Sequence, residues 1–526
     1  MANGSKTVVL KPQGVTFADV INVARFNAKV EISDEAKSAI DKSRKYIDEY
    51  TQGGKAIYGV STGFGALADK FIDPKDRVEL QKSLIRSHAA GVGEPIEAEV
   101  VRALIFLRLR TFVSGRTGVR YELAKTYADF LNANITPVVP EFGSLGCSGD
   151  LAPLSHCALA MMGEGQVIDS DGKIVDSLVA MKKAGINPIE LKEKEGLALI
   201  NGTDGMLGML IMALADLRNL TLSADITTAL SIEGLLGTDR VFAPDLHAGL
   251  RNQVGQATSA ANLYALLKGS EIVASHFEGD TRVQDAYSLR CAPQVNGAVR
   301  DIIDYASTIA ERELSSAIDN PVVLPDGRVE SNGNFHGAPV AYVLDFLAIA
   351  ATDLGSMSER RTDRMLDPAR SVGLPAFLAF NAGVDSGLMI AQYTQAALVS
   401  ENKRLSTPAS VDSIPSSAMQ EDHVSMGWSA ARKLRKVIDN LTHILGIELL
   451  TAARAVELRK GLKPAKPTQA VISELRKVVD PIGPDRFLSP EMERATLVIK
   501  EGRAVSAAKA VVTTCLLYTS PSPRDS

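Results

Sequence analysis

Apolar residues recur at helical spacing along much of this 526-residue chain, most clearly between residues 416 and 463, a stretch that contains no proline. Positions three and four apart face the same side of an α-helix, so the pattern predicts a long helix with one buried face. The apolar positions that carry it are Leu434, Val437, Ile438, Leu441, Ile444 and Leu445. Residues 340–351 are apolar on nearly every face, which predicts a helix buried in a large bundle or between subunits.

The first 140 residues mix shorter patterns of both kinds. A strand is expected at residues 56–60 and a buried helix at residues 100–113. The segment GSLGCSG at residues 143–149 contains three glycines and predicts a loop. A helix is expected over residues 150–162, because Asp150 suits a helix start and the first turn tolerates Pro153.

These patterns divide the chain into three parts. Residues 1–205 are expected to carry the glycine-rich loop and other functional loops, and residues 206–515 a bundle of long helices. Residues 516–526 are rich in Ser and Pro and predict a disordered tail or a junction introduced by cloning or assembly. The most apolar stretch, residues 205–215, is expected to be a buried helix too short to span a bilayer.

Composition narrows the function classes. Hydrophobic residues make up 45% of the chain and aromatic residues only 5%, which favours a core of close-packed helices. The net charge of −5 argues against non-specific nucleic-acid binding, which requires a basic face. Four cysteines in a chain of this length predict no disulfide framework, and the first residues do not resemble a signal peptide. A soluble cytoplasmic protein without a membrane span is therefore expected.

Two common kinds of site are disfavoured. No two of the seven histidines are closer than 20 residues and no cysteine pair has metal-ligand spacing, so no metal site is expected. The segment at residues 63–68 fits a dinucleotide-binding pattern, G-x-G-x-x-A. The region about 20 residues later is expected to be helical, without the strand and acidic residue of that motif, so a tight loop in which backbone passes closely is favoured over nucleotide binding.

Several blocks, in this order, resemble one enzyme family. They are YGVSTGFG (58–65), SHAAGVGEP (87–95), GSLGCSGDLAPLSH (143–156), NGTD (201–204), QDAYSLRCAPQ (284–294), DNP (319–321), GNFHG (333–337) and QEDHVSMG (420–427). Ordered blocks at compatible spacing from about residue 7 to about 510 are far more specific than any single motif. The chain resembles the aromatic amino acid ammonia-lyase family, and its histidine-type members most.

The resemblance implies a cofactor made from the chain itself, 4-methylidene-imidazol-5-one (MIO), formed from Cys147-Ser148-Gly149. The Gly149 nitrogen would attack the carbonyl carbon of residue 147 and close a ring with loss of water, and Ser148 would lose its hydroxyl as a second water. Glycine suits this step because it has no Cβ and adopts strained dihedrals. Residue 147 contributes only its carbonyl carbon to the ring, so Cys147 is expected to be accepted where Ala is commonest. Ammonia elimination needs such an electrophile because an amine is a poor leaving group.

Other roles follow from the resemblance position by position. Tyr58 matches the base that removes the β-proton, which requires a phenol pKa below its ordinary value of about 10. Arg290 matches the residue that binds the substrate carboxylate, where a planar fork suits the geometry. The residues expected to line substrate and cofactor are Asn201, Gln284, Tyr287 and Phe335.

The expected substrate is L-histidine, and the expected product is trans-urocanate. Ser87-His88 matches the histidine-type selectivity pair of the family, and Glu421 matches a carboxylate that faces the imidazole N–H. Asp204 departs from the family pattern, which has Gln after Asn-Gly-Thr, so hydrogen bonding behind the site is expected to differ. Taken singly, each of these residues is more often structural, but taken as a set in register with the glycine-rich loop they favour the functional interpretation.

The fold implied by the resemblance is mainly α, with a long central helical bundle and an N-terminal active-site region, like that of the fumarase and aspartase group. It also implies a homotetramer whose sites are shared between subunits. Three alternatives stay open: a tyrosine or phenylalanine ammonia-lyase with the same cofactor, an MIO-dependent aminomutase, and an inactive helical pseudoenzyme.

Overall fold

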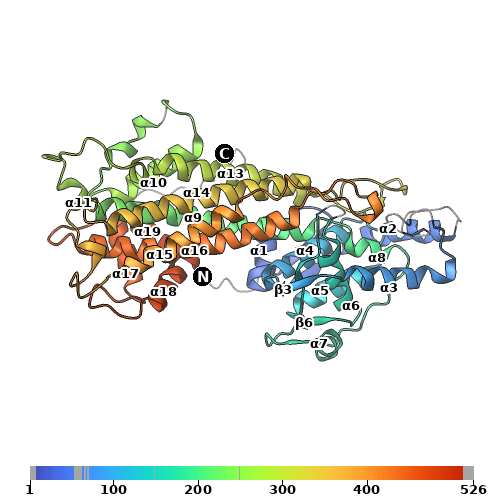
Figure 1. The fold of residues 1–526 in the computed structure, drawn as a ribbon. Coiled ribbons are helices and arrows are strands. Elements are labelled where there is room, and N and C mark those ends of the chain that lie inside the picture. Colours follow the sequence, from blue (N-terminus) through green and yellow to red (C-terminus); the bar gives the residue numbers. More distant parts are fainter. Residues whose placement is uncertain are drawn as a thin grey trace. The chain divides into compact units, whose positions relative to one another are not determined.

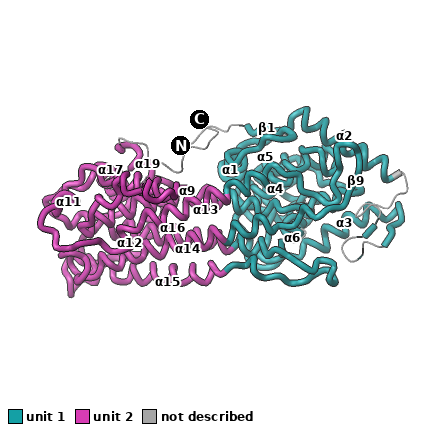
Figure 2. The backbone as a smooth tube through the Cα atoms, turned by 90° about the horizontal axis from the view of Figure 1, so that it is seen from above, with its two compact units in different colours: residues 1–212, 307–345, 408–432 teal, residues 213–306, 346–407, 433–526 magenta. Residues whose placement is uncertain are grey.

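The computed structural model describes residues 7–52, 62–63, 67, 70–146, 149–247 and 249–512, and this part of the chain is mainly helical (Figure 1). The chain forms two compact units, each assembled from three segments (Figure 2). The first comprises residues 1–212, 307–345 and 408–432, and the second comprises residues 213–306, 346–407 and 433–526. The division at residue 205 that the sequence predicts, between an N-terminal region and a long-helix bundle, stays a prediction.

The first unit combines helices with short strands, as the sequence predicts. Its helices are α1 (Phe17–Phe26), α2 (Asp34–Gln52), α3 (Arg77–His88), α4 (Ala98–Val113), α5 (Tyr121–Asn132), α6 (Leu151–Met161), α7 (Ser177–Ala184), α8 (Glu195–Ile200) and the short η2 (Pro74–Asp76) and η6 (Ser417–Met419). Its strands are β1 (Val8–Leu10), β2 (Val30–Ile32), β3 (Val92–Pro95), β4 (Thr136–Pro137), β5 (Pro140–Phe142), β6 (Gln166–Ile168), β7 (Ile174–Asp176), β8 (Val322–Val323) and β9 (Val329–Glu330).

The strands form small sheets at the edges of these helices. Strands β1 and β2 pair in parallel, whereas β3 with β5, β4 with β6, β6 with β7, and β8 with β9 pair antiparallel. The predicted helix at residues 100–113 is confirmed as α4, and every residue from Val100 to Val113 is buried. The predicted strand at residues 56–60 lies outside the described residues.

The second unit is built from helices in its described part. Helices that lie wholly within it are α10 (Val254–Leu267), α11 (Glu271–Ala274), α12 (Tyr287–Arg290), α15 (Met389–Leu405), α17 (Lys466–Leu475), α18 (Ser489–Lys500), α19 (Arg503–Lys509) and the short η3 (Arg240–Phe242), η4 (Pro244–Leu246) and η5 (Ala376–Leu378). Helices that contribute residues to both units are α9 (Asp204–Gly234), α13 (Ala292–Leu314), α14 (Ala338–Leu366) and α16 (Gly427–Glu457).

Helix α16 confirms the clearest periodic prediction. All six apolar positions named for it, from Leu434 to Leu445, are at most 5% exposed. Helix α14 contains the stretch that is apolar on nearly every face, but part of that stretch reaches the surface of the chain. Tyr342, Phe346 and Ile349 are 49%, 43% and 47% exposed. The sequence predicts that this helix is buried either within a bundle or between subunits. Packing within the chain covers only part of its apolar surface.

Among the described residues, two helical stretches, Glu195–Gly234 and Ala338–Leu366, have the length and apolar composition that could cross a membrane. The most apolar window of the first is 100% buried and that of the second is 61% buried. Helices inside the core of a globular protein meet the same two criteria. The expectation of a buried helix at residues 205–215 is confirmed, but its length was underestimated, because α9 continues beyond Asp216 to Gly234.

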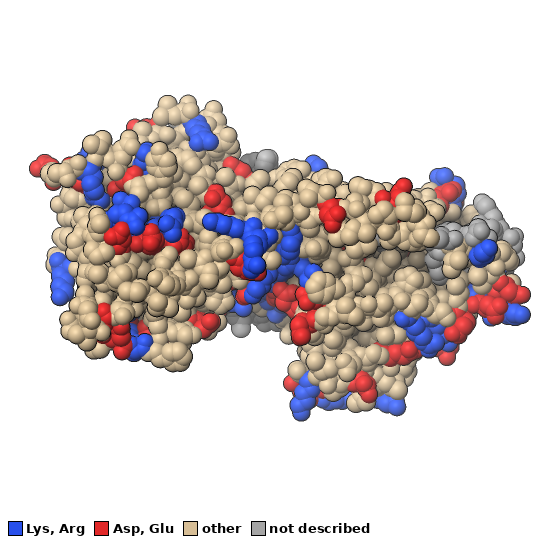
Figure 3. Space-filling view, in the orientation of Figure 1, with Lys and Arg blue, Asp and Glu red and all other residues tan. Residues whose placement is uncertain are grey.

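On the face shown in Figure 3, basic and acidic side chains lie next to one another. Local pairs of opposite charge in the chain include Arg360 with Glu359 and Arg370 with Asp367. Charges of both signs are present on this face, with a group of Lys and Arg side chains near its centre (Figure 3).

Candidate active site

A cavity of about 1050 Å³ lies in the first unit. Four residues predicted from the sequence line it together: His88, Asn201, Phe335 and Glu421. They come from four separate segments of the chain, so the fold brings together what the sequence separates by more than 300 residues. Further lining residues are Leu80, Leu84, Ser87, Leu151, Leu197, Ile200, Asn320, Ser331, Asn332, His336, Gln420, Asp422 and His423.

The remaining predicted residues lie elsewhere. Tyr58, Cys147 and Ser148 are outside the described residues. Gln284, Tyr287 and Arg290 belong to the second unit and are described with it below.

His88 is the last residue of α3, and its ring faces the cavity. Its Nδ1 lies 3.0 Å from the hydroxyl of Ser87. Burial lowers the pKa of His88 below its ordinary value, and the negative charge of Glu421 opposes that shift only in part. The imidazole of His88 is therefore neutral at pH 7, and it can offer one hydrogen-bond donor and one acceptor.

Asn201 follows α8 directly and is 3% exposed. Its Nδ2 donates a hydrogen bond to the carbonyl of Asn320 (3.3 Å), and its own carbonyl accepts one from Arg108 Nη1 (2.7 Å). The Oδ1 of Asn201 is buried without a hydrogen-bond partner among the described residues. Because buried polar atoms are normally paired, this acceptor is free for a group bound in the cavity.

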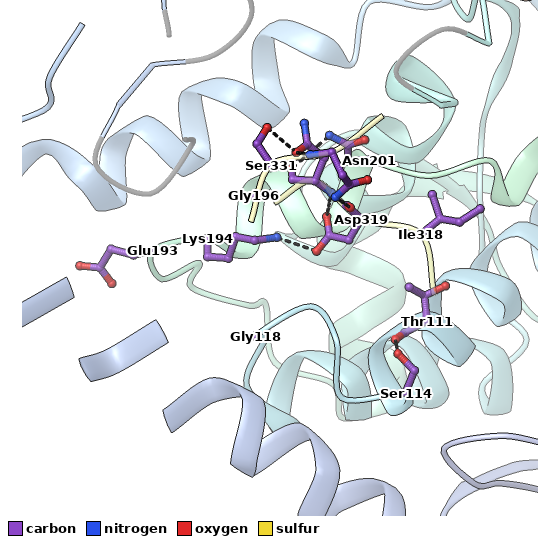
Figure 4. Close-up of polar contacts among 12 residues, drawn as sticks. Thr111, Ser114, Gly118, Glu193, Lys194, Gly196, Asn201, Ile318, Asp319 and Ser331 are labelled. Carbon is purple, nitrogen blue, oxygen red and sulfur yellow. Dashed lines mark hydrogen bonds and ion pairs between the residues drawn. The ribbon is translucent and has the colours of Figure 1, made fainter. Parts of the chain in front are cut away.

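A fully buried ion pair lies behind this wall of the cavity (Figure 4). Lys194 Nζ lies 2.6 Å from Asp319 Oδ2, and both side chains are 0% exposed. Burial lowers the pKa of Lys194 and raises that of Asp319, and the charge of each partner opposes the shift of the other. Asp319 Oδ1 accepts from the amide of Asn320 (2.8 Å). The pair thus fixes the backbone that holds Asn201.

Glu421 lies on a loop closed by a backbone bridge to Ser416, whose hydroxyl also donates to Glu421 Oε2 (3.0 Å). Two residues later, the carbonyl of His423 accepts from His336 Nε2 (3.2 Å), and the two imidazole rings stack with their centroids 5.8 Å apart. These contacts tie the loop that carries Phe335 to the loop that carries Glu421. The motif blocks contained both histidines, but nothing in the sequence indicated that they pair.

The glycine-rich loop is held on both sides of residues 147 and 148. On one side, the Gly146 carbonyl accepts from Ser425 Oγ (2.7 Å) and from the amide of Gly337 (3.1 Å). On the other side, Gly149 has φ +78°, and a Cβ there would lie 2.1 Å from the Gly202 carbonyl oxygen. Only glycine fits this position, both in conformation and in space.

The predicted role of Asp150 needs correction. It precedes α6 as expected, but its side chain makes no capping hydrogen bond to that helix. Its carboxylate instead accepts from the amide of Met206 (2.8 Å), in the first turn of α9, and from Ser144 Oγ (3.0 Å). Burial raises the pKa of Asp150 to about 7 against the effect of these donors. Asp150 therefore caps α9 rather than α6, because the first turn of α9 lies next to the glycine-rich loop.

Asp204, the departure from the family pattern, begins α9 and is 3% exposed. Its Oδ2 lies 3.4 Å from Arg108 Nη1, the nitrogen that also binds the Asn201 carbonyl. Arg108 was missed from the sequence, because an arginine in an apolar helix carries no signal of its distant partners. The shorter acidic residue at position 204 thus forms an ion pair behind the cavity.

The second unit presents Arg290 and Tyr287 on the four-residue helix α12. Arg290 Nε donates to the carbonyl of Asp285 (3.0 Å), and its guanidinium carbon lies 4.6 Å from the centre of the Tyr287 ring. None of the described residues hydrogen-bonds either Nη of Arg290. Tyr287 is 70% exposed. The guanidinium is therefore anchored at Nε and stacked, with its outer edge free for a planar anion.

The candidate dinucleotide loop is only partly described. The amide of Gly63 donates to the carbonyl of Lys70 (3.0 Å), and a Cβ on Gly63 would lie 2.6 Å from the carbonyl oxygen of Leu67. The backbone at Gly63 thus lies close to the backbone at Leu67, as the tight-loop interpretation predicts. Residues 64–66 and 68 lie outside the described residues.

The lowered pKa of His88 predicts a pH dependence of stability. Below its ordinary pKa of about 6.5, the unfolded chain binds a proton on this side chain before the folded chain does. The free energy of unfolding should therefore fall as the pH drops from 6.5 towards the folded pKa, and this contribution should be absent in His88→Asn. Urea denaturation of both proteins between pH 7.5 and 5 measures it. A difference between the two proteins that stays constant over this range would contradict the assignment of a neutral, half-buried imidazole.

Comparison with known proteins places this arrangement in a family. The family model described as aromatic amino acid lyase matches residues 15–477. A histidine ammonia-lyase of Streptomyces avermitilis is 64% identical over 506 residues, which are 96% of this chain and 99% of that protein. A tyrosine aminomutase from Streptomyces globisporus has a similar structure, with a TM-score of 0.92 and 37% identity over 97% of this chain and 100% of that one. A histidine ammonia-lyase from Trypanosoma cruzi has a TM-score of 0.89 at 39% identity, over 98% of this chain and 99% of that one. The chain belongs to the aromatic amino acid lyase family.

Proposed function

We propose that this lyase is a histidine ammonia-lyase, which eliminates ammonia from L-histidine to give trans-urocanate. The observation that carries the proposal is that His88 and Glu421 line one cavity with Asn201 and Phe335, where the charge of Glu421 acts on His88. The name of the relative from Streptomyces avermitilis, which is similar over nearly the whole of both chains, supports the same substrate.

The chemistry of the cavity favours an imidazole. A carboxylate such as Glu421 accepts a hydrogen bond from an imidazole N–H, and neutral His88 adds a second polar group on the same wall. A phenyl side chain offers no donor to Glu421 and therefore gains no such hydrogen bond from it. A tyrosine or phenylalanine lyase and an aminomutase remain the alternatives, and activity measurements separate them.

The residues present fit an MIO group at positions 147–149. The left-handed φ of Gly149 and the lack of room for a Cβ there suit a ring that only glycine can close. The unpartnered Oδ1 of Asn201 is a buried acceptor on the adjacent wall. Cys147, Ser148 and Gly149 would form the group, and it supplies an electrophile that makes the substrate amine a leaving group.

The chain's own side chains bind and orient the amino acid. Arg290 holds the substrate carboxylate through the outer edge of its guanidinium, while stacking on Tyr287 limits its rotation. Gln284, which is proposed to line the substrate as well, precedes them in the same block of the sequence. In this proposal Tyr58 removes the β-proton, and Glu421 holds the imidazole of the substrate.

Exchange of Glu421 for Gln tests the substrate assignment. The variant keeps the shape of the side chain but loses a charge-assisted hydrogen bond, so kcat/KM for L-histidine should fall about 10- to 100-fold. Urocanate absorbance measures the rate. Asp412→Asn, which makes the same charge change on the loop of residues 408–426 away from the cavity, should stay within about twofold of the unchanged protein. A Glu421→Gln variant as active as Asp412→Asn would refute the proposed role.

The enzyme is proposed to act as a cytoplasmic homotetramer with active sites shared between subunits. Helix α14 leaves Tyr342, Phe346 and Ile349 exposed at helical spacing, an apolar face of the kind that subunit interfaces cover. Tyr287, beside Arg290, is 70% exposed, although a residue that binds substrate is normally enclosed. This exposure supports the proposal that another subunit covers it.

Phe346→Glu tests the assembly. A charge on this face should separate the subunits and abolish activity with them, because burying an unpaired carboxylate is costly. Light scattering after gel filtration should give about 224 kDa for the unchanged protein, four times its 56.1 kDa chain, and a smaller mass for the variant. Phe487→Glu, at a phenylalanine that is 79% exposed, serves as the control and should remain tetrameric. A 56 kDa species with full activity would exclude shared sites.

A further inference from the structure

The core of the second unit contains a buried ion pair that the proposed mechanism does not use. Arg361 on α14 and Glu448 on α16 are both 0% exposed. The guanidinium binds the carboxylate in a fork, with Nε donating to Oε1 and Nη2 donating to Oε2 (3.0 Å). Replacing such a pair by apolar residues is often neutral or stabilising, so stability alone does not explain its presence.

Hydroxyl groups complete the environment of the Glu448 carboxylate. Thr227 Oγ1 (2.9 Å) and Ser358 Oγ (2.6 Å) donate to Oε2, and Ser231 Oγ (2.8 Å) donates to Oε1. These residues lie on α9 and α14, so one carboxylate on α16 joins three of the longest helices. A carboxylate with this many donors has a single preferred position, and it holds the Arg361 guanidinium equally firmly.

The third guanidinium nitrogen of Arg361, Nη1, contacts a residue outside this ion-pair cluster. Arg361 Nη1 donates to the carbonyl of Ser288 (3.3 Å), in the middle of α12 between Tyr287 and Arg290. The last four carbonyls of any helix lack partners within it, and α12 is only four residues long. The Ser288 carbonyl therefore depends on a donor from outside its helix, and the donor is the rigid fork of Arg361.

We infer that Arg361 is a positioning residue for the substrate: it fixes α12 so that Arg290 presents its free edge to the substrate carboxylate. This inference rests on the proposed role of Arg290 in binding that carboxylate. Arg290 is held locally by its own bond to Asp285, and α12 is held to the bundle by Arg361 and by the buried side chain of Leu289. Lysine at position 361 can pair with Glu448 but cannot also reach Ser288 from a planar fork.

The central test is a double-mutant cycle on the full-length enzyme, measured as KM and kcat for L-histidine. Arg361→Lys should raise KM about tenfold with kcat within about twofold, because binding of the carboxylate is lost equally in ground state and transition state. Arg290→Gln should raise KM at least as much. Because Arg361 acts through Arg290, Arg361→Lys should raise KM no further in the Arg290→Gln background.

Ser231→Ala is the matched control. It removes one donor to the same carboxylate and lowers the urea midpoint, but Thr227 and Ser358 still bind that carboxylate and the Ser288 contact is kept, so its KM should stay within about twofold of the unchanged enzyme. The inference is overturned if Ser231→Ala raises KM as much as Arg361→Lys, if Arg361→Lys leaves KM unchanged, or if its effect persists in the Arg290→Gln background. An unchanged KM in Arg290→Gln would instead remove the proposed role of Arg290, and the inference with it.

Discussion

The backbone contact between Gly149-Asp150 and Gly202 is the constraint around which the cavity is organised. The amide of Asp150 donates to the carbonyl of Gly202 at 2.7 Å, and the two backbones approach so closely that position 149 has no space for a side chain. Gly202 follows Asn201, so this contact sets the glycine-rich loop beside the side chain with the free buried acceptor. The Gly146 carbonyl is fixed equally firmly from the segments that carry Phe335 and Glu421. The backbone on both sides of residues 147 and 148 is therefore held by contacts with distant segments of the chain.

Buried charges serve the same purpose in both units. Arg108 with Asp204, Lys194 with Asp319, and Arg361 with Glu448 are all almost fully buried. In each pair a charged group also fixes backbone next to a predicted functional residue: the carbonyl of Asn201, the amide of Asn320, or the carbonyl of Ser288. Desolvation makes such pairs poor sources of net stability, but removing one partner is severely destabilising, so they hold one geometry. In each unit, ion pairs thus fix the backbone next to residues that the sequence predicts to be functional.

Local patterns in the sequence were sufficient to predict where helices form, but they did not predict which distant residues those helices contact. Helical periodicity identified α4 and α16, and the position of Asp150 gave the start of α6. The same residue also shows the limit of local reasoning, because its carboxylate caps α9, which begins more than 50 residues later in the chain. The contact of Arg108 with Asn201 spans 93 positions and that of Ser425 with Gly146 spans 279, and no local pattern indicates either.

The candidate site was predicted by resemblance rather than by periodicity. Four of its residues line one cavity, whereas Arg290 and Tyr287 lie in a different compact unit, which spacing along the chain could not have indicated. The supporting residues Arg108, Arg361 and Glu448 were missed because a charged residue inside an apolar helix indicates burial of a pair but not the identity of the partner.

Ultraviolet detection of the product, with L-histidine, L-tyrosine and L-phenylalanine supplied separately to the purified enzyme, tests the central claim most directly. The account predicts urocanate from L-histidine and no cinnamate or coumarate from the other two amino acids, because the imidazole N–H pairs with Glu421 beside neutral His88. Cinnamate or coumarate without urocanate would contradict the histidine assignment while leaving the family and its elimination chemistry in place. No product from any of the three would contradict the proposal that the loop at residues 147–149 becomes an electrophile.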